Sequence, residues 1–339
     1  MSSRPDMRLD HAGHCLTTRC VDGLLEVDLH APPLNEIGLP MLSELERVAQ
    51  LIGAPDPRFH AVLFHSSLEG GFSAGADLRE LHEGLTSVDG DAGMGAWVDH
   101  AQRLFDSPKT AGRALVGALR GVSSGGVSAK DVTAGAARRT AKVWGVRAFL
   151  DRIHAVMNTI DMAPVPTICA THGVVFGGGF ELALTCDVIV ADKSSRFAFP
   201  ELRLGLVPGF GGIPRLERDL GNAVVRDLIL SGRSLGATRA HEVGLVAQLV
   251  ARGKAPDVAR RLAKQMGRFD AHTARTAKRF LKPLPAARLE EEKRVFCALM
   301  TSPVVLEALT TFVTSKDAMP YLPGRGRPAP KPAPAPRER

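Results

Sequence analysis

The stretch PTICATHGVVFGGGFELALTCDVIVADKSSRFAFPELRLGLVPGFGG, residues 166–212, determines the fold and carries the candidate chemistry. Its apolar start, residues 166–170, is typical of a buried strand. The glycine triplet Gly177–Gly179 then leads into a helical segment from Phe180 to Cys186. This order of strand, tight turn and helix predicts free backbone N–H groups at a helix N-terminus, where the helix dipole favours developing negative charge.

Two carboxylates flank this turn. Glu181 falls in the first turn of the helix, and Glu201 follows Pro200 just before the Gly/Pro-rich loop 208–212. Together with an anion-stabilising turn they favour acid–base chemistry on an activated carbonyl. Simpler interpretations stay open: Glu181 could only complement the helix dipole, Glu201 could be an ordinary turn residue, and the glycine triplet could be a plain turn.

Composition predicts one large globular domain with appendages, or two modest domains, because 45% of the 339 residues are hydrophobic. The five cysteines are odd in number and scattered, without C-x-x-C spacing, and no H-E-x-x-H pattern occurs, so we expect no metal site. Cys169 and Cys186 lie in apolar segments and should be buried thiols. The polar N-terminus and the lack of a long apolar run predict a cytoplasmic protein without a membrane span.

The net charge of +7 is concentrated in two segments. Residues 107–147 contain eight basic residues and one acidic residue, and residues 324–339 contain five and one. The rest of the chain is therefore acidic. A nucleic-acid-binding protein on an enzyme-like scaffold is one reading of this charge, but a single Tyr and two Trp offer few rings on which bases could stack.

Before the deciding stretch, the sequence alternates strand and helix signals. Residues 15–30 predict a hairpin that turns at Asp22-Gly23, and residues 38–52 have apolar residues at helical spacing. A strand at 60–65, a loop and a helix from about Asp77 follow. This rhythm predicts a mixed α/β fold with crossover connections.

Residues 87–147 interrupt the rhythm, because they are rich in Gly, Ala, Ser and Arg and show weak periodicity. We expect a partly flexible insertion with some helix near 96–105 and 140–160, and a helix from about Val146 to Ile160 that leads into the deciding stretch. Helices are predicted at 213–220, 222–231 and 237–243, each followed by glycine within one residue, and four more over 255–316. The tail from Pro323 is rich in Pro and Ala, which predicts disorder.

Three segments resemble the crotonase (enoyl-CoA hydratase/isomerase) superfamily in order and spacing: Phe72–Leu78, His172–Ala183 and Phe199–Gly212. Ser231-Gly232 and residues 240–246 continue the likeness, which covers about 15–86 and 146–322. The resemblance implies an α/β fold with a core of repeated ββα units in a spiral and a C-terminal helical region. It also implies an acyl thioester substrate.

An enolate forms when water adds to a conjugated thioester, and two backbone N–H groups about 3 Å from its oxygen stabilise it. The resemblance implies that these donors belong to Ala76 and Gly178, where the missing Cβ lets a ligand approach the backbone. It further implies that Glu181 activates a water molecule and that Glu201 exchanges the proton at the carbon alpha to the thioester.

Both glutamates favour an enoyl-CoA hydratase. The alternatives within the superfamily are a double-bond isomerase, a decarboxylase and a thioester hydrolase. The resemblance implies contacts to coenzyme A, which is part of the substrate and leaves no separate cofactor; the carrier could also be an acyl carrier protein. The implied binding residues are Leu34, Ala74, Gly75, Ala76, Asp77, Gly177, Gly178, Phe312 and Lys316.

Three of these assignments have structural alternatives. Asp77 could simply cap its helix, Phe312 could pack between helices, and Lys316 could lie in solvent. Relatives commonly form homotrimers or dimers of trimers, which the apolar faces of 287–315 would allow.

The insertion departs from compact relatives and could be a lid, a contact for a carrier or a passive loop. We therefore divide the chain into a flexible N-terminus (1–14), a crotonase-like core (15–250) containing the basic insertion (about 87–147), a C-terminal helical region (251–322) and a disordered tail (323–339).

Overall fold

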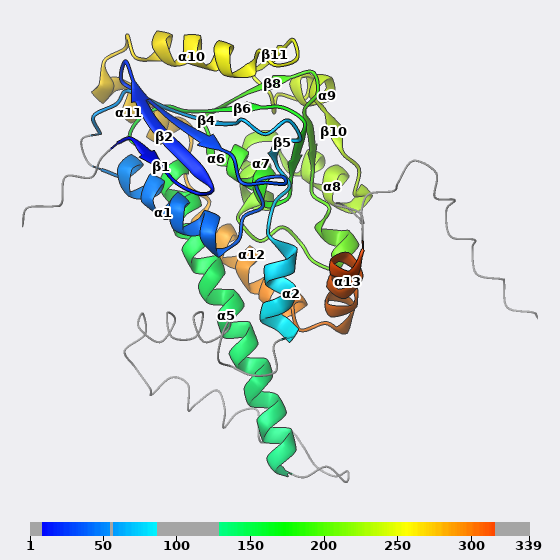
Figure 1. Cartoon of the computed structure of the whole chain (residues 1–339). Coiled ribbons are helices and arrows are strands. Elements are labelled where there is room, and N and C mark those ends of the chain that lie inside the picture. The colour runs from blue at the N-terminus through cyan, green and yellow to red at the C-terminus, as the bar shows by residue number, and fades with distance from the viewer. Residues whose placement is uncertain (1–8, 55–56, 87–128, 316–339) are drawn as a thin grey trace, which may run out of the picture.

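The computed structural model describes residues 9–54, 57–86 and 129–315, with side chains described from Gly145 onward in the last range (Figure 1). The helix expected near 96–105, most of the basic insertion, the Pro-rich tail and Lys316 lie outside the described residues.

Two sheets form the core of the described chain. The larger has the strand order β1 (His11–Ala12), β2 (Leu16–Val21), β3 (Leu24–Leu29), β4 (Ala61–Ser66), β6 (Thr167–Thr171), β8 (Val188–Asp192) and β11 (Gln248–Val250). The smaller has the order β10 (Leu235–Gly236), β9 (Arg196–Ala198), β7 (Val174–Phe176) and β5 (Gly71–Ser73). From β3 to β11 all neighbours are parallel, and β5, β7 and β9 are parallel too.

The chain repeats one unit three times. In each unit the first strand joins the larger sheet, the second joins the smaller sheet, and a helix follows (Figure 1). The units are β4–β5–α2 (Leu78–Thr86), β6–β7–α6 (Gly178–Thr185) and β8–β9 with the 3-10 helix η2 (Glu201–Leu204) and α7 (Gly212–Leu220). The predicted core of repeated ββα units is confirmed.

The N-terminal hairpin forms as predicted. Val21 pairs with Leu24, and both turn residues, Asp22 and Gly23, have positive φ, as a two-residue hairpin turn requires. The helix α1 (Leu39–Ile52) follows, and its apolar stripe packs against α5.

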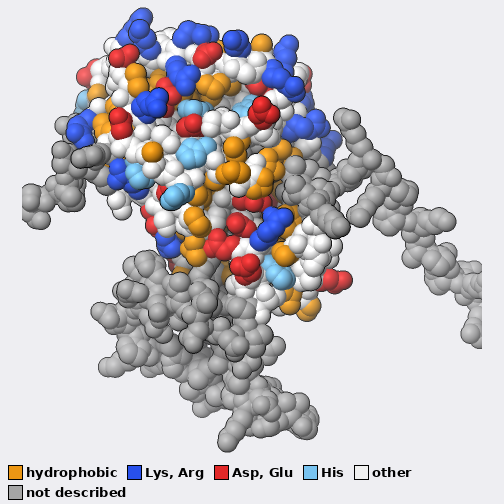
Figure 2. All heavy atoms as spheres, viewed as in Figure 1, with side chains coloured by type: hydrophobic (Ala, Val, Ile, Leu, Met, Phe, Trp, Pro, Cys, Tyr) orange, Lys and Arg blue, Asp and Glu red, His pale blue; other side chains and the backbone are white. Residues whose placement is uncertain are grey.

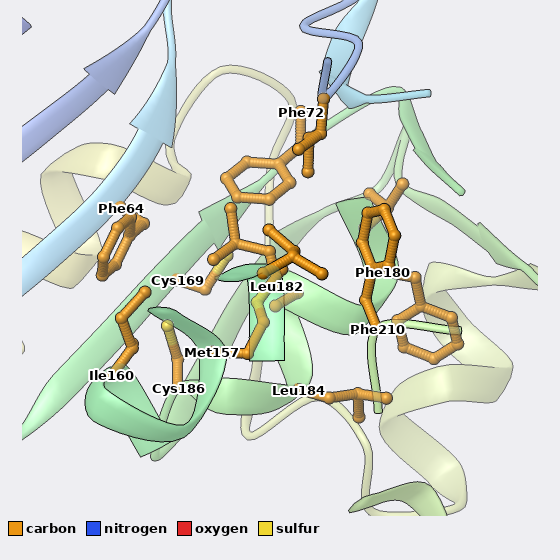
Figure 3. Packing of buried hydrophobic residues seen from close by; sticks show 14 of the residues in the cluster. Phe64, Phe72, Met157, Ile160, Cys169, Phe180, Leu182, Leu184, Cys186 and Phe210 are labelled. Atoms are coloured by element: carbon orange, nitrogen blue, oxygen red, sulfur yellow. The ribbon is translucent and has the colours of Figure 1, made fainter. Parts of the chain in front are cut away.

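The two faces of the larger sheet are covered differently. The helix α10 (Ala255–Met266) lies across one face, with Ala255, Ala259 and Ala263 against the strands. Its outer side carries Lys and Arg, and basic side chains gather along this edge of the molecule (Figure 2). On the other face all eight residues of α6 are buried. Figure 3 shows Leu182 of α6 beside Met157 and Cys169 in this core. A carboxylate on this helix is therefore largely shielded from bulk water.

The remaining helices agree with the sequence periodicity. They are α8 (Asn222–Ser231), α9 (Ala237–Glu242), α11 (Ala271–Leu281), α12 (Ala286–Leu299) and α13 (Pro303–Thr314). All five cysteines are free, with Cys169 and Cys186 buried as predicted. Among the described residues no single helix is long and apolar enough to cross a membrane; the pair α12 and α13, bent by 81° where they meet, qualifies by length and composition alone.

Two predicted boundaries need correction. Residues 1–14 were expected to be flexible, but His11 and Ala12 pair with β2, and Glu44 accepts the N–H groups of His14 and Leu16, both at 2.9 Å. The helix predicted over 146–160 begins earlier, because α5 runs from Ala129 to Asp161 and includes the last part of the expected insertion. Figure 1 shows α5 extending away from the body of the molecule.

Candidate active site

The two predicted oxyanion donors come together from loops that are distant in sequence. Ala76 lies in an extended segment, and the residues on either side of it bond to Ile37. The Ile37 N–H donates to Gly75 O at 2.7 Å, and the Asp77 N–H donates to Ile37 O at 3.2 Å. Because N–H groups alternate in direction along extended chain, the Ala76 N–H points away from Ile37. It lies beside Gly178, where an added Cβ would be 3.4 Å from Ala76 N.

This close approach requires glycine at position 75. Its φ is +103°, and a Cβ there would lie 3.0 Å from Gly178 N and 2.9 Å from Phe176 O. Gly178 is the first residue of α6, so its N–H has no partner inside the helix. Within the described residues neither this N–H nor that of Ala76 donates to a protein acceptor. The two amides are therefore available to a ligand oxygen.

Glu181 lies one turn further along α6 and is 1% exposed. Its Oε1 accepts the N–H groups of Phe210 at 2.8 Å and Gly212 at 2.7 Å. Burial raises the pKa of Glu181 to about 7, while these hydrogen bonds and the nearby Arg215 charge act in the opposite direction. Glu181 is thus a carboxyl that ionises near neutral pH.

Glu201 begins η2, immediately after Pro200. Its Oε1 lies 2.7 Å from where a Cβ on Gly177 would stand, and its Oε2 is buried without a hydrogen-bond partner in the described chain. Burial, followed by repulsion from Glu181, raises the pKa of Glu201 well above its ordinary value. Both pKa values are raised, and the repulsion disfavours ionising the two carboxyls together, so the pair can supply one base and one acid.

The four predicted groups share one cavity. Ala76, Gly178, Glu181 and Glu201 all line it, and its empty space, counted together with the open solvent at its mouth, is about 500 Å³. The rest of the wall is largely apolar, formed by Leu78, Leu81, Leu204, Leu206, Phe210 and Phe296 among others. Among the described residues no cluster of three or more His, Cys, Asp or Glu side chains could hold a metal ion. The arrangement can stabilise an oxyanion and move protons on either side of a double bond.

A buried network fixes the loop that holds Glu181. Arg215 donates from one nitrogen to Phe210 O and Gly211 O, both at 3.1 Å, and pairs with fully buried Asp161 at 2.8 Å. His154 on α5 donates from Nε2 to Gly209 O at 2.8 Å, since a carbonyl oxygen can only accept. Burial lowers the pKa of His154 to about 4, so it stays neutral in this role.

The predicted coenzyme A residues lie in different settings. Ala74 N–H donates to Leu34 O at 2.8 Å, which brings these two loops together, and Ala74 and Gly177 line the cavity. Asp77 caps α2, because its Oδ1 accepts the N–H groups of Arg79 and Glu80, each at 3.0 Å. Asp77 therefore has a structural role, whatever its part in binding.

Phe312 is 4% exposed, and the Arg79 guanidinium lies 5.5 Å from the centre of its ring. From α13 the ring packs toward α2, which agrees with the helix-packing role that was the alternative to a contact with coenzyme A. Contacts of these residues with coenzyme A stay predictions.

Sequence reasoning missed Glu292. This α12 residue is 6% exposed and accepts the N–H of Gly211 at 2.6 Å and of Ile213 at 3.0 Å. A signal was present, since Leu289, Glu292 and Phe296 have helical spacing and share one buried face. A carboxylate on an apolar stripe needs a partner.

A sequence model of the enoyl-CoA hydratase/isomerase family matches residues 147–318. A probable enoyl-CoA hydratase of Mycobacterium tuberculosis is 34% identical over 194 residues, which are 56% of this chain and 76% of that protein. The human mitochondrial enoyl-CoA hydratase domain-containing protein 2 is 32% identical over 246 residues, 72% of this chain and 64% of that protein.

Solved structures agree with the fold. An enoyl-CoA hydratase from Bacillus halodurans superposes with a TM-score of 0.66 at 17% identity, covering 88% of this chain and 99% of that chain. An enoyl-CoA hydratase/isomerase from Xanthobacter autotrophicus Py2 gives a TM-score of 0.67 at 21% identity, covering 89% and 94%. The fold predicted from the crotonase resemblance is confirmed.

Proposed function

Because this chain belongs to the enoyl-CoA hydratase/isomerase family, we propose that it adds water across the 2,3 double bond of an enoyl thioester. One observation carries the proposal: the carboxyl groups of Glu181 and Glu201 line one cavity together with two backbone amides that have no acceptor in the described chain. Hydration needs one group that takes a proton from water and another that gives a proton to carbon. Coenzyme A or an acyl carrier protein would carry the acyl group.

In the proposed reaction the thioester oxygen accepts hydrogen bonds from the amides of Ala76 and Gly178. Ionised Glu181 takes a proton from water as the water oxygen bonds to C3. The π electrons of the double bond move toward the thioester, and the amides stabilise the resulting enolate oxygen. Protonated Glu201 then gives its proton to C2. Water has been added, and a proton moving from Glu181 to Glu201 through solvent restores the enzyme.

The test mixes the purified chain with 2-enoyl-CoA thioesters of increasing chain length and follows the conjugated thioester absorbance and the product mass. We expect the absorbance to fall and the product to gain the mass of one water. A product of unchanged mass would indicate double-bond migration instead. No turnover with any chain length, from a folded sample, would contradict the proposal.

The same two carboxyls predict the pH dependence. The base must be ionised, so kcat/KM should rise with pH through about 7, the pKa to which burial brings Glu181. The acid must be protonated, so kcat/KM should fall at higher pH as Glu201, whose pKa burial also raises, loses its proton. The apparent pKa values belong to the pair.

A pH series of kcat/KM measures both limbs. In the Glu201→Gln variant the residual kcat/KM should still rise with pH through about 7, but it should no longer fall at higher pH. Activity that increases as the pH falls below 6 would contradict the assignment of Glu181 as the base.

A further inference from the structure

The segment Gly209–Ile213, which we term the glycine turn, lies between two buried carboxyls. From α12, Glu292 accepts the N–H of Gly211 at Oε1 and the N–H of Ile213 at Oε2. The two amides that alternate with these, at positions 210 and 212, donate to Glu181 Oε1. Four consecutive N–H groups are thus shared between a carboxyl on α6 and a carboxyl on α12.

Burying the Glu292 carboxylate lowers the stability of the folded protein unless its oxygens are hydrogen-bonded. Glu292 is 6% exposed, and burial, then repulsion from Glu181, raises its pKa well above the ordinary value. An apolar side chain would suit the stripe formed by Leu289 and Phe296 and would avoid that cost. The N–H groups of Gly211 and Ile213 would then lose their acceptors, which is unfavourable because these amides are buried or partly buried.

We propose that Glu292 is the positioning residue of Glu181: it holds two amides of the glycine turn so that the other two present their hydrogen atoms to Glu181 Oε1. The inference rests on the proposed function, in which Glu181 activates the water. Glu292 does not line the cavity, so it reaches the reaction through Glu181, by way of the turn and of the charge repulsion between the two carboxyls. A purely structural reading also exists, because Gly211 is the N-cap of α7 and Glu292 satisfies the start of that helix.

The test compares Glu292→Gln with Lys293→Met. Glutamine keeps the size of the side chain and one acceptor oxygen, but its NH2 group cannot accept the second N–H. Lys293, the next residue of α12, ion-pairs with Asp151 at 2.6 Å and with Glu290 at 2.9 Å, and none of its hydrogen bonds or ion pairs in the described chain goes to the glycine turn. The Lys293→Met variant therefore removes a contact between α12 and α5 and leaves the hydrogen bonds from the glycine turn to Glu292 in place.

For Glu292→Gln we expect kcat on 2-enoyl-CoA to fall on the order of 10- to 100-fold, because small displacements of a reacting group are costly. KM should change by less than about threefold, since no substrate contact is lost. Amide hydrogen exchange, followed by mass spectrometry, should accelerate in peptides covering 206–216. The Lys293→Met enzyme should keep both kcat and the slow exchange. A structural role alone would lower the Tm without this separation of kcat from KM.

If Glu292→Gln fails to fold, Glu292→Asp retains the charge, withdraws the acceptors from the turn and should show the same separation. Unchanged kcat and unchanged exchange in peptides 206–216 would overturn the proposal. The exchange measurement does not depend on activity. An inactive wild-type chain would therefore contradict the hydratase proposal, while the exchange rates would still decide whether Glu292 holds the turn.

Discussion

Glu201→Gln is expected to lower kcat for hydration on the order of 10²–10⁴-fold. The substitution keeps the shape of the side chain, but an amide cannot give a proton to C2. The buried Oε2 has no protein partner in the described chain, so no neighbouring group is placed to replace it. Glu181→Gln should have an effect of similar size, because an amide oxygen can still accept the N–H groups of Phe210 and Gly212 but cannot take a proton from water.

Stability separates this loss from misfolding. Burial raises the pKa of Glu201 above its value in the unfolded chain, so the folded protein disfavours the ionised carboxyl. Above the unfolded pKa the group therefore lowers stability, and glutamine removes that penalty. The Tm of Glu201→Gln should be equal to or higher than that of the wild type, as is common when a functional group is removed from an active site.

The matched control is Glu307→Gln, the same change at an exposed position of α13. Its kcat and Tm should both equal those of the wild type. A decrease in kcat of less than about threefold for Glu201→Gln would remove its assignment as the acid. If only Glu181→Gln abolished water addition and double-bond migration persisted, Glu201 would serve proton transfer in an isomerase.

Local signals explain how much of the fold the sequence could predict. The turn at Asp22-Gly23 and the apolar stripe of α1 depend on neighbouring residues only, and both were placed correctly. The start of α5 at Ala129 was missed because its first residues lack apolar periodicity; their Ala, Lys and Arg content favours helix by propensity instead. Strand β1 was missed because its two residues are held by backbone pairing, which leaves no hydrophobic pattern.

The residues of the candidate site also fall into those that local sequence predicts and those that depend on tertiary packing. Glu181 at a helix start and the glycine triplet could be recognised from the chain itself, but the pairing of Ala76 with Gly178 came only from the family resemblance. No local pattern reports a contact between loops about a hundred residues apart. Glu292 and Arg215 act on the glycine turn from α12 and α7. Their burial depends on the packed core, which periodicity alone does not resolve.

Gly178→Ala is expected to lower kcat/KM on the order of 10²–10³-fold, the loss that follows removal of an oxyanion donor. The added Cβ would lie 2.6 Å from Phe210 Cε2 and 3.4 Å from Ala76 N. The methyl group therefore stands beside the other donor. Relief of the contact with Phe210 requires either the ring or the start of α6 to move, and Phe210 packs against Phe149 with the ring centres 5.7 Å apart.

The control is Gly236→Ala, where an added Cβ meets no atom within 4 Å and the backbone φ of −72° suits alanine. It should leave both kcat/KM and Tm unchanged. Binding of a saturated acyl-CoA, measured by calorimetry, distinguishes the causes of a loss in Gly178→Ala. Because an oxyanion donor acts most strongly in the transition state, that affinity should fall much less than kcat/KM. Equal losses in both would mean that the methyl group excludes the thioester altogether. Unchanged kcat/KM would contradict the prediction, because it would show that the site accommodates the methyl group without displacing either amide.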